Sequence, residues 1–283
     1  MTDNDPLVTA EWLKSHIDAP DIRVVDATWI PPWSPDASPS AAKRLYMDGH
    51  IPGAVFFDID QIAETDSPYP HMMPGPEKFS SNARKLGLGD GKTIIVYDRG
   101  DFIASARVWW MIRHMGHRDV KVLDGGWSAW LRIDGKVEDL EPVVSERHHT
   151  VRVQNQLIKS YDQMLQNLET TEFKVLDARS TGRFDGTEAE PRAGLSSGHI
   201  PNSSNVPASS LVDQDGKLKS KSDLQDLLGE FSGEANLVAS CGSGVSAAVI
   251  LLALFRLGRD DVALYDGSWT EWASKDSSTI AKA

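Results

Sequence analysis

The sequence reads Asn236-Leu-Val-Ala-Ser-Cys241 just before a glycine-containing loop, and an earlier stretch, Thr93-Ile-Ile-Val-Tyr-Asp98, has the same pattern. Three further pairs of matching blocks accompany these two stretches, in the same order in both halves of the chain. They are Arg23-Val-Val-Asp-Ala27 with Lys174-Val-Leu-Asp-Ala178, Gly49-His-Ile-Pro-Gly53 with Gly198-His-Ile-Pro-Asn202, and Asp124-Gly-Gly-Trp127 with Asp266-Gly-Ser-Trp269. A repeat at a lag of about 140 to 150 residues indicates two homologous domains.

Each half alternates short β-branched runs with helical stretches. In the first half we predict buried strands over residues 22–26, 94–97 and 120–123, and helices over residues 76–86 and 105–115. Strands that alternate with helices form a parallel sheet, and functional sites gather at the carboxyl ends of its strands. The sequence therefore predicts an α/β protein with two tandem domains, each a mainly parallel sheet with helices on both faces.

The domain boundaries follow from the repeat. We place the first domain at residues 1–140 and the second at residues 157–283, joined by a linker over residues 141–156 that has no clear apolar period. At the end of the matching strand, the first domain carries Asp98 where the second carries Cys241. We therefore expect a non-catalytic first domain that shapes the site and a catalytic second domain.

Composition limits the possible partners. A chain of 283 residues has the length of two domains, and 29 Lys and Arg against 41 Asp and Glu give a net charge of −12. This charge argues against nucleic acid or an anionic membrane surface as a partner. The sequence shows neither an apolar run of about 18 residues nor the features of a signal or transit peptide. We expect a cytoplasmic protein that binds neither nucleic acid nor membrane.

Cys241 is the only cysteine, and a lone cysteine is most often a small buried apolar residue. Here it ends a predicted strand and is followed by Gly242-Ser-Gly-Val245 and by a predicted helix over residues 246–256. The backbone N–H groups of such a loop, together with the positive end of the helix dipole, stabilise an anion. We therefore expect a reactive thiolate at Cys241, with space for a second sulfur atom beside it.

Cysteine phosphatases use a similar loop, but they need an arginine at its far end to bind phosphate. This chain has Ala247 at that position. The sequence therefore disfavours phosphoryl chemistry.

These residues resemble the rhodanese superfamily, and the tandem arrangement looks like that of the thiosulfate and 3-mercaptopyruvate sulfurtransferases. The resemblance covers nearly the whole chain, and it rests on the Gly-His-Ile-Pro blocks, the Asp-Gly-Gly/Ser-Trp blocks and the loop after Cys241. It implies two rhodanese-like domains and a persulfide on Cys241. The thiosulfate branch typically has an Arg-Lys pair where this chain has Gly242-Ser243, so the loop is more similar to the 3-mercaptopyruvate branch. An inorganic dianion requires cations in the loop, whereas an organic thiol needs space and a proton donor.

The resemblance also implies a pair of substrate-binding arginines. Arg183 and Arg192 match the two arginines that grip the carboxylate and the keto oxygen of 3-mercaptopyruvate. Planar guanidinium groups suit a 2-oxo acid better than an ammonium does. The alternative is that both arginines pair with the neighbouring acids Asp185, Glu188 and Glu190.

A catalytic relay is implied in the same way. Asp60 and His71 match positions proposed to form a triad with the loop serine, which is Ser243 here. Asp60 would orient His71, His71 would tune the Ser243 hydroxyl, and Ser243 would serve the developing enolate. Gly242, Gly244 and Val245 are expected to surround the substrate. The alternative for His71 is a solvated residue in a proline-rich loop.

The resulting prediction is a sulfurtransferase. Sulfur passes from 3-mercaptopyruvate through a Cys241 persulfide to a thiol such as thioredoxin or glutathione, or to cyanide, and pyruvate is released. No metal and no organic cofactor is needed. Two alternatives stay open, a thiosulfate:cyanide sulfurtransferase and a non-catalytic rhodanese-like binding module. The neutral loop argues against the first, and a thiol in this loop argues against the second.

The other histidines are predicted to be structural. His114 and His117 lie three residues apart without an acidic or cysteine partner in the pattern, so we predict no metal site there. The histidines of the two Gly-His-Ile-Pro blocks occupy equivalent places, which predicts one structural hydrogen bond in each domain. The pair His148-His149 is predicted to lie in the solvated linker.

Overall fold

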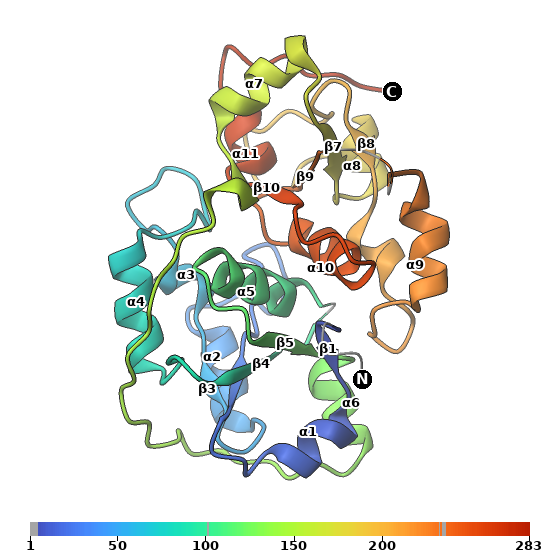
Figure 1. Cartoon of the computed structure of the whole chain (residues 1–283). Helices are drawn as coiled ribbons and strands as arrows, with labels where there is room; N and C mark the ends of the chain where they lie inside the picture. Colours follow the sequence, from blue (N-terminus) through green and yellow to red (C-terminus); the bar gives the residue numbers. More distant parts are fainter. Residues whose placement is uncertain (1–4, 101, 232, 234–235) are drawn as a thin grey trace.

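The chain forms two parallel sheets, one in each half, as seen in a computed structural model that describes residues 5–100, 102–231, 233 and 236–283 (Figure 1). The strand order is β1-β5-β4-β2-β3 in the first sheet and β6-β10-β9-β7-β8 in the second. These orders are identical once the second is renumbered from its own first strand, which confirms the predicted duplication and the α/β class. The strands are β1 (Leu7–Val8), β2 (Ile22–Asp26), β3 (Val55–Phe56), β4 (Thr93–Tyr97), β5 (Val120–Leu123), β6 (Ile158–Lys159), β7 (Lys174–Asp177), β8 (Ser204–Asn205), β9 (Leu237–Ser240) and β10 (Ala263–Tyr265).

Helices cover both faces of each sheet (Figure 1). Those of the first half are α1 (Ala10–His16), α2 (Ala41–Asp48), α3 (Ile59–Ile62), α4 (Pro76–Lys85), α5 (Ile103–His114) and α6 (Gly126–Arg132). Those of the second half are α7 (Tyr161–Thr170), α8 (Thr181–Asp185), α9 (Lys221–Leu228), α10 (Ala247–Arg256) and α11 (Ser268–Trp272). Short 3-10 turns lie at η1 (Asn155–Leu157), η2 (Ala208–Leu211) and η3 (Gly229–Phe231).

The apolar core has three layers because successive side chains of a strand point to opposite faces of its sheet. In β2, Val25 joins the central layer and Val24 joins the layer on the outer face of the first sheet. In β9, Ala239 joins the central layer and Val238 the outer layer of the second sheet. The central layer contains residues of both halves, so the core continues across the domain boundary.

The two halves meet through α5 and α10, which are buried along nearly their whole length (Figure 1). α5 follows β4 and α10 follows β9, so each interface helix comes soon after the residue that directly follows its strand, Asp98 or Cys241. The Trp109 ring contacts the Phe255 ring edge to face at a centroid distance of 5.4 Å. This packing fixes the loop after β9 relative to the first half.

The predicted elements agree closely with the structure. The strand over residues 22–26 is β2, the strand over 120–123 is β5, and the one over 94–97 begins a residue earlier as β4. The helix over 76–86 ends at Lys85, and the helix over 105–115 begins earlier, at Ile103.

The segment between the domains is not a free linker. Residues 139–154 contain no helix or strand, and they run along α4 and past the end of α5 (Figure 1). Their backbone nevertheless bonds to the first half, with Arg152 N donating to Met115 O (2.9 Å) and Gln154 N to His114 O (2.7 Å).

The prediction that both histidines of the pair 148–149 lie in solvent is therefore wrong for one of them. His148 is exposed, but His149 is only 2% exposed. Its ring lies 5.6 Å from that of Phe79, and its Nδ1 bonds to the carbonyl of Leu88. Burial lowers the pKa of His149, which keeps the imidazole neutral at neutral pH.

The histidines of the Gly-His-Ile-Pro blocks make the predicted equivalent hydrogen bonds. Nδ1 of His50 lies 2.8 Å from Tyr46 O, and Nδ1 of His199 lies 2.8 Å from Phe184 O. In both places the imidazole also stacks on the ring of the residue whose carbonyl it contacts. The repeat therefore preserves a structural hydrogen bond at this position.

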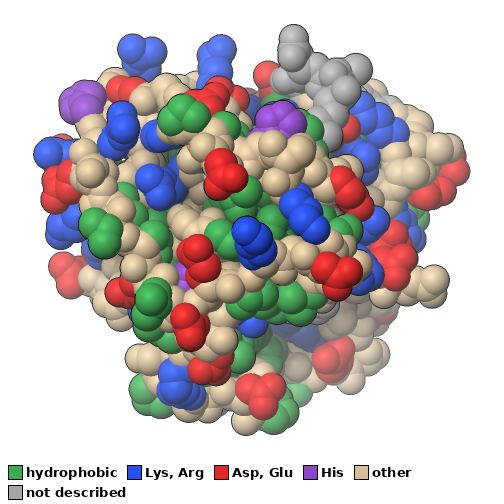
Figure 2. Space-filling view, turned by 90° about the horizontal axis from the view of Figure 1, so that it is seen from below, with side chains coloured by type: hydrophobic (Ala, Val, Ile, Leu, Met, Phe, Trp, Pro, Cys, Tyr) green, Lys and Arg blue, Asp and Glu red, His purple; other side chains and the backbone are tan. Residues whose placement is uncertain are grey.

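The net charge of −12 is not concentrated on the face shown in Figure 2, where acidic and basic side chains are interspersed. Among the described residues, no helix has the length and apolar character needed to cross a membrane.

Candidate active site

Cys241 follows the last residue of β9 and is 1% exposed. The segment that begins α11 holds its backbone, because Trp269 N donates to Cys241 O (2.9 Å) and Cys241 N lies 3.2 Å from Ser268 Oγ. Gly244 has φ +76°, and a Cβ there would lie 2.9 Å from the carbonyl oxygen of Asp266. The loop therefore needs glycine at this position to turn tightly around the thiol.

The loop presents unpaired amides next to the thiol. Within the described part of the chain, the backbone N–H groups of residues 242–246 have no hydrogen-bond acceptor, and α10 begins immediately afterwards at Ala247. Such an arrangement of donors stabilises an anion.

In the matching loop of the first half, backbone N–H groups donate to a carboxylate. Asp98 is buried there, and its carboxylate accepts from Ser105 N (2.7 Å) and Gly100 N (3.2 Å). Burial raises the pKa of Asp98, while these N–H groups oppose the increase. The first half thus fills its loop with a carboxylate of its own, where the second half places a thiol.

The structure brings Asp60, His71 and Ser243 into one chain of contacts. Nε2 of His71 lies 2.9 Å from Oδ1 of Asp60, and Nδ1 of His71 lies 2.9 Å from Oγ of Ser243. With the Nε2 proton donated to the carboxylate, Nδ1 can accept the serine hydroxyl. His71 is 7% exposed, so it is not the solvated loop residue of the alternative interpretation.

Arg192 reaches the same serine. Its Nη2 donates to Ser243 Oγ at 3.2 Å, and its guanidinium carbon lies 4.8 Å from the centre of the Trp33 ring. Burial lowers the pKa of Arg192, the nearby Cys241 opposes this, and Arg183 adds to the lowering. The guanidinium therefore lies close enough to Cys241 to interact with a negative charge on its sulfur.

Arg183 lies beside the loop but is already partnered. A Cβ on Gly242 would lie 3.1 Å from Nη2 of Arg183 and 3.6 Å from Nη1 of Arg192, so both cations border this glycine. Glu190 accepts from Arg183 Nη2 at 2.6 Å. It also pairs with Arg179, at 2.8 Å. Arg183 therefore has one of the acidic partners that the alternative interpretation named. This ion pair with Glu190 also orients the Arg183 guanidinium.

Two residues behind the loop connect it to the first half. Arg107 of α5 is 1% exposed, and its Nη2 pairs with Oδ1 of Asp266 at 2.9 Å. Its guanidinium also donates to the carbonyls of Gly244 and His71. The other oxygen of Asp266 accepts from Met73 N at 2.6 Å. This buried pair therefore holds the cysteine loop and the histidine loop together.

Comparison with known proteins identifies the family of the chain. The Rhodanese-like domain matches the chain twice, over residues 9–133 and 160–275. The chain belongs to the rhodanese family.

Several tandem rhodaneses are similar over almost the full length. Human 3-mercaptopyruvate sulfurtransferase is 40% identical over 94% of this chain and 91% of that protein. Rat thiosulfate sulfurtransferase is 39% identical over the same shares of the two chains. The crystal structure of SseA from Escherichia coli, described as a 3-mercaptopyruvate sulfotransferase with the rhodanese fold, has a TM-score of 0.84 at 37% identity and covers 93% of this chain and 98% of its own. Overall identity to the two curated relatives is nearly equal, so it does not separate the two sulfur donors.

The sequence did not indicate every residue at this rhodanese site. Trp29 donates its Nε1 hydrogen to Asp60 Oδ2 (3.1 Å), and its ring meets that of His71 edge to face at 5.1 Å. No pattern pointed to Trp29, because it belongs to an irregular stretch. The sequence contained a signal for Arg107, because this charged residue stands directly before the apolar run of α5 over residues 108–112.

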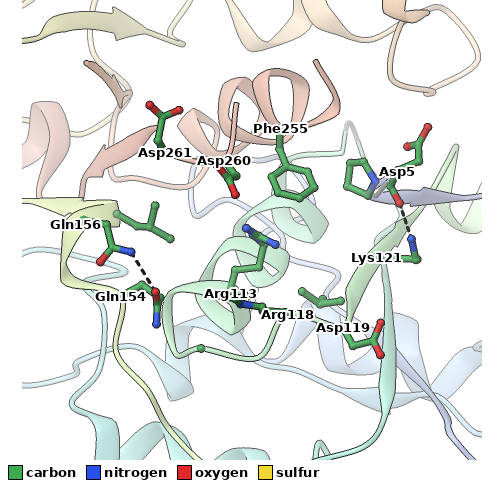
Figure 3. Close-up of a pocket in the computed structure, with 14 residues that line it drawn as sticks. Asp5, Arg113, Arg118, Asp119, Lys121, Gln154, Gln156, Phe255, Asp260 and Asp261 are labelled. Atoms are coloured by element: carbon green, nitrogen blue, oxygen red, sulfur yellow. Dashed lines mark hydrogen bonds between the residues drawn. The ribbon is translucent and has the colours of Figure 1, made fainter. Parts of the chain in front are cut away.

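Two hollows of similar volume differ in their relation to the rhodanese site. One of about 370 Å³ lies between the domains, against Arg113 and Phe255, and none of the predicted site residues lines it (Figure 3). Another of about 380 Å³ is bordered by Asp60 and His71. The second is therefore the one that adjoins the candidate active site.

Proposed function

We propose that this chain is a 3-mercaptopyruvate sulfurtransferase that works through a persulfide on Cys241. The observation that carries the proposal is the position of the Ser243 hydroxyl, two residues from the nucleophile and in contact with both His71 and Arg192. When its proton turns from His71 to the substrate, a hydroxyl held in this way can donate to a keto oxygen that becomes an enolate. Thiosulfate has no such oxygen, so the relay has a use only with a 2-oxo acid.

The first half-reaction uses the thiolate of Cys241. Its sulfur attacks the sulfur of 3-mercaptopyruvate, so that an S–S bond forms and the C–S bond breaks. The electron pair of the C–S bond passes into the enolate of pyruvate, which Ser243 and Arg192 stabilise. Protonation of that enolate gives pyruvate, and His71, oriented by Asp60, supports the proton movement through Ser243. The free amides after Cys241 support the persulfide anion.

The second half-reaction transfers the outer sulfur to an acceptor. A thiolate or cyanide attacks that sulfur, the S–S bond breaks, and the Cys241 thiolate is restored. Thioredoxin, glutathione and cyanide are the proposed acceptors. A reduced single cysteine suits the cytoplasm, which remains the proposed compartment. In this scheme the second domain, residues 157–283, is catalytic, and the first, residues 1–140, contributes Asp60 and His71 without a nucleophile of its own.

The donor preference tests the proposal directly. With cyanide as acceptor, kcat/KM for 3-mercaptopyruvate is expected to exceed that for thiosulfate, because the neutral residues Gly242 and Ser243 give the loop no cation of its own for an inorganic dianion. Steady-state assays of both donors on the purified chain measure this ratio. A ratio below one would assign the protein to thiosulfate while keeping the persulfide. Turnover of neither donor would favour a non-catalytic binding module.

The serine relay gives a second expected result. Ser243→Ala and His71→Gln should each lower kcat for 3-mercaptopyruvate by about 100- to 10,000-fold, since assistance to the proton movement is lost. Turnover of thiosulfate should change far less, because that reaction forms no enolate. Ser246→Ala, in the same loop, is the matched control. Equal losses for the two donors would contradict the relay and indicate a structural role for these residues.

A further inference from the structure

Three potential metal ligands from distant parts of the chain meet on the first domain. Asp90 lies between α4 and β4, His117 between α5 and β5, and His149 in the segment that joins the domains. One ligand atom of each lies within 4.8 Å of the others. The sequence-based prediction of no metal site rested on the spacing of His114 and His117, and the partner of His117 turns out to be His149, far away in the sequence.

The hydrogen bonds of the two imidazoles define which nitrogen is free. Nδ1 of His149 bonds to Leu88 O, and Nε2 of His117 bonds to Lys92 O at 2.9 Å. A carbonyl oxygen only accepts, so each of these nitrogens carries the proton. The remaining nitrogens, Nε2 of His149 and Nδ1 of His117, therefore present lone pairs. Histidines that bind metals characteristically donate their other N–H to a backbone carbonyl in this way.

The free nitrogen of His149 has no partner. The residue is 2% exposed, and its Nε2 is buried without a hydrogen bond. Nearby, the Asp90 carboxylate accepts from the backbone N–H and the hydroxyl of Thr150, at 3.1 and 2.5 Å. Each imidazole thus keeps one nitrogen with a lone pair, and a ligand atom of each of the three residues lies within 4.8 Å of the others. A cation bound among them would give the buried Nε2 of His149 the partner that it lacks, whereas a second proton on this imidazole would create a charge that burial disfavours.

The separation of the two imidazoles suits a small transition-metal ion. The centroids of the stacked His117 and His149 rings lie 5.8 Å apart. Two imidazoles that share one Zn²⁺ through bonds of about 2.0 to 2.1 Å place their centroids about 5 to 6 Å apart. A hollow of about 660 Å³, lined in part by Asp90, His117 and Thr150, gives water access to a fourth position. A set of two imidazoles and one carboxylate favours Zn²⁺, Co²⁺ or Ni²⁺ over Mg²⁺ or Ca²⁺.

We propose that Asp90, His117 and His149 form a structural binding site for Zn²⁺ or a similar divalent transition-metal ion. Because His149 belongs to the segment between the domains and the other two ligands belong to the first domain, the ion fastens that segment in place. The site is separate from Cys241, so the proposal does not depend on the sulfurtransferase function.

The test is a titration of the full-length, chelator-treated protein with Zn²⁺, followed by calorimetry and by the melting temperature. We expect one ion per chain and a higher Tm. Asp90→Asn, which is nearly isosteric on an exposed residue, and His117→Gln should each weaken Zn²⁺ binding at least about tenfold and reduce the gain in Tm. His148→Gln, an exposed neighbour outside the site, is the matched control and should bind like the unmodified chain.

The free thiol of Cys241 could also bind the metal ion. A second probe therefore distinguishes binding at Cys241 from binding at the proposed site. Co²⁺ should give the visible absorption of a nitrogen and oxygen site without a sulfur charge-transfer band, and alkylation of Cys241 should leave binding unchanged. Absence of Zn²⁺ binding would overturn the proposal. So would unchanged affinity in Asp90→Asn and His117→Gln, or loss of binding after alkylation.

Discussion

The Cys241→Ser variant is expected to lose sulfur transfer from every donor, with kcat falling by roughly a millionfold, as in other enzymes that lose their nucleophile. A serine hydroxyl in this position is neither ionised near neutral pH nor able to form a persulfide. Its size matches that of the thiol, so the buried position and the loop around it should be preserved. Pyruvate release measures the rate, and mass spectrometry of the chain after reaction with donor alone measures the persulfide.

The first half offers the matched control for this experiment. Asp98→Asn changes the equivalent position of the other domain, where the side chain accepts backbone hydrogen bonds and has no proposed chemical role. That variant should keep its kcat and still gain one sulfur atom per chain. Sulfur transfer that survives Cys241→Ser, or that disappears in a folded Asp98→Asn, would show that the nucleophile has been wrongly assigned.

The largest expected effect on stability comes from the buried pair behind the site. Arg107→Met should lower the free energy of unfolding by about 3 to 5 kcal/mol, because it leaves a buried carboxylate without its counter-ion. The side chains of Arg107 and Asp266 are 1% and 4% exposed, and they lie 2.9 Å apart. The carbonyls of Gly244 and His71 lose a donor at the same time. Urea unfolding at neutral pH measures the loss.

Two controls distinguish the pair from general damage to the interface. Arg113→Met alters another arginine of α5, which lies over aromatic rings and has no ion-pair partner among the described residues. This variant should lower the free energy of unfolding by less than Arg107→Met does. The double variant Arg107→Met/Asp266→Leu should lose less free energy of unfolding than the sum of the losses in the two single variants, because it leaves no charge unpaired. Additive losses would show that the two side chains do not act as a pair.

The sequence was sufficient for the fold because its signals are local and repeated. The short strand-like run before Cys241 has a counterpart before Asp98, and both runs form central strands followed by interface helices. By contrast, the contact between His71 and Ser243 joins residues 172 positions apart, and no periodicity encodes it. Only the family resemblance suggested that these residues meet.

Sequence patterns could not predict the burial of His149 or the ion pair of Arg107, for a related reason. A histidine in a polar segment is usually solvated, and only the packing of that segment against Phe79 and Leu88 reverses this. Likewise, Arg107 stands next to apolar residues of α5, but its partner Asp266 belongs to the other half of the chain. Contacts of this kind are determined by how the two domains dock.

The division of the site between two domains has a consequence for biosynthesis. Domains of a nascent chain generally fold in order, starting with the N-terminal one. The first domain can bury its strands while the ribosome is still adding residues 157–283, but His71 meets Ser243 only when α10 has docked on α5. The contact between His71 and Ser243 is therefore completed only after the second domain has been synthesised and has docked. A translation product that ends before Cys241 keeps Asp60 and His71 but lacks the proposed nucleophile, so under the proposed mechanism it forms no persulfide.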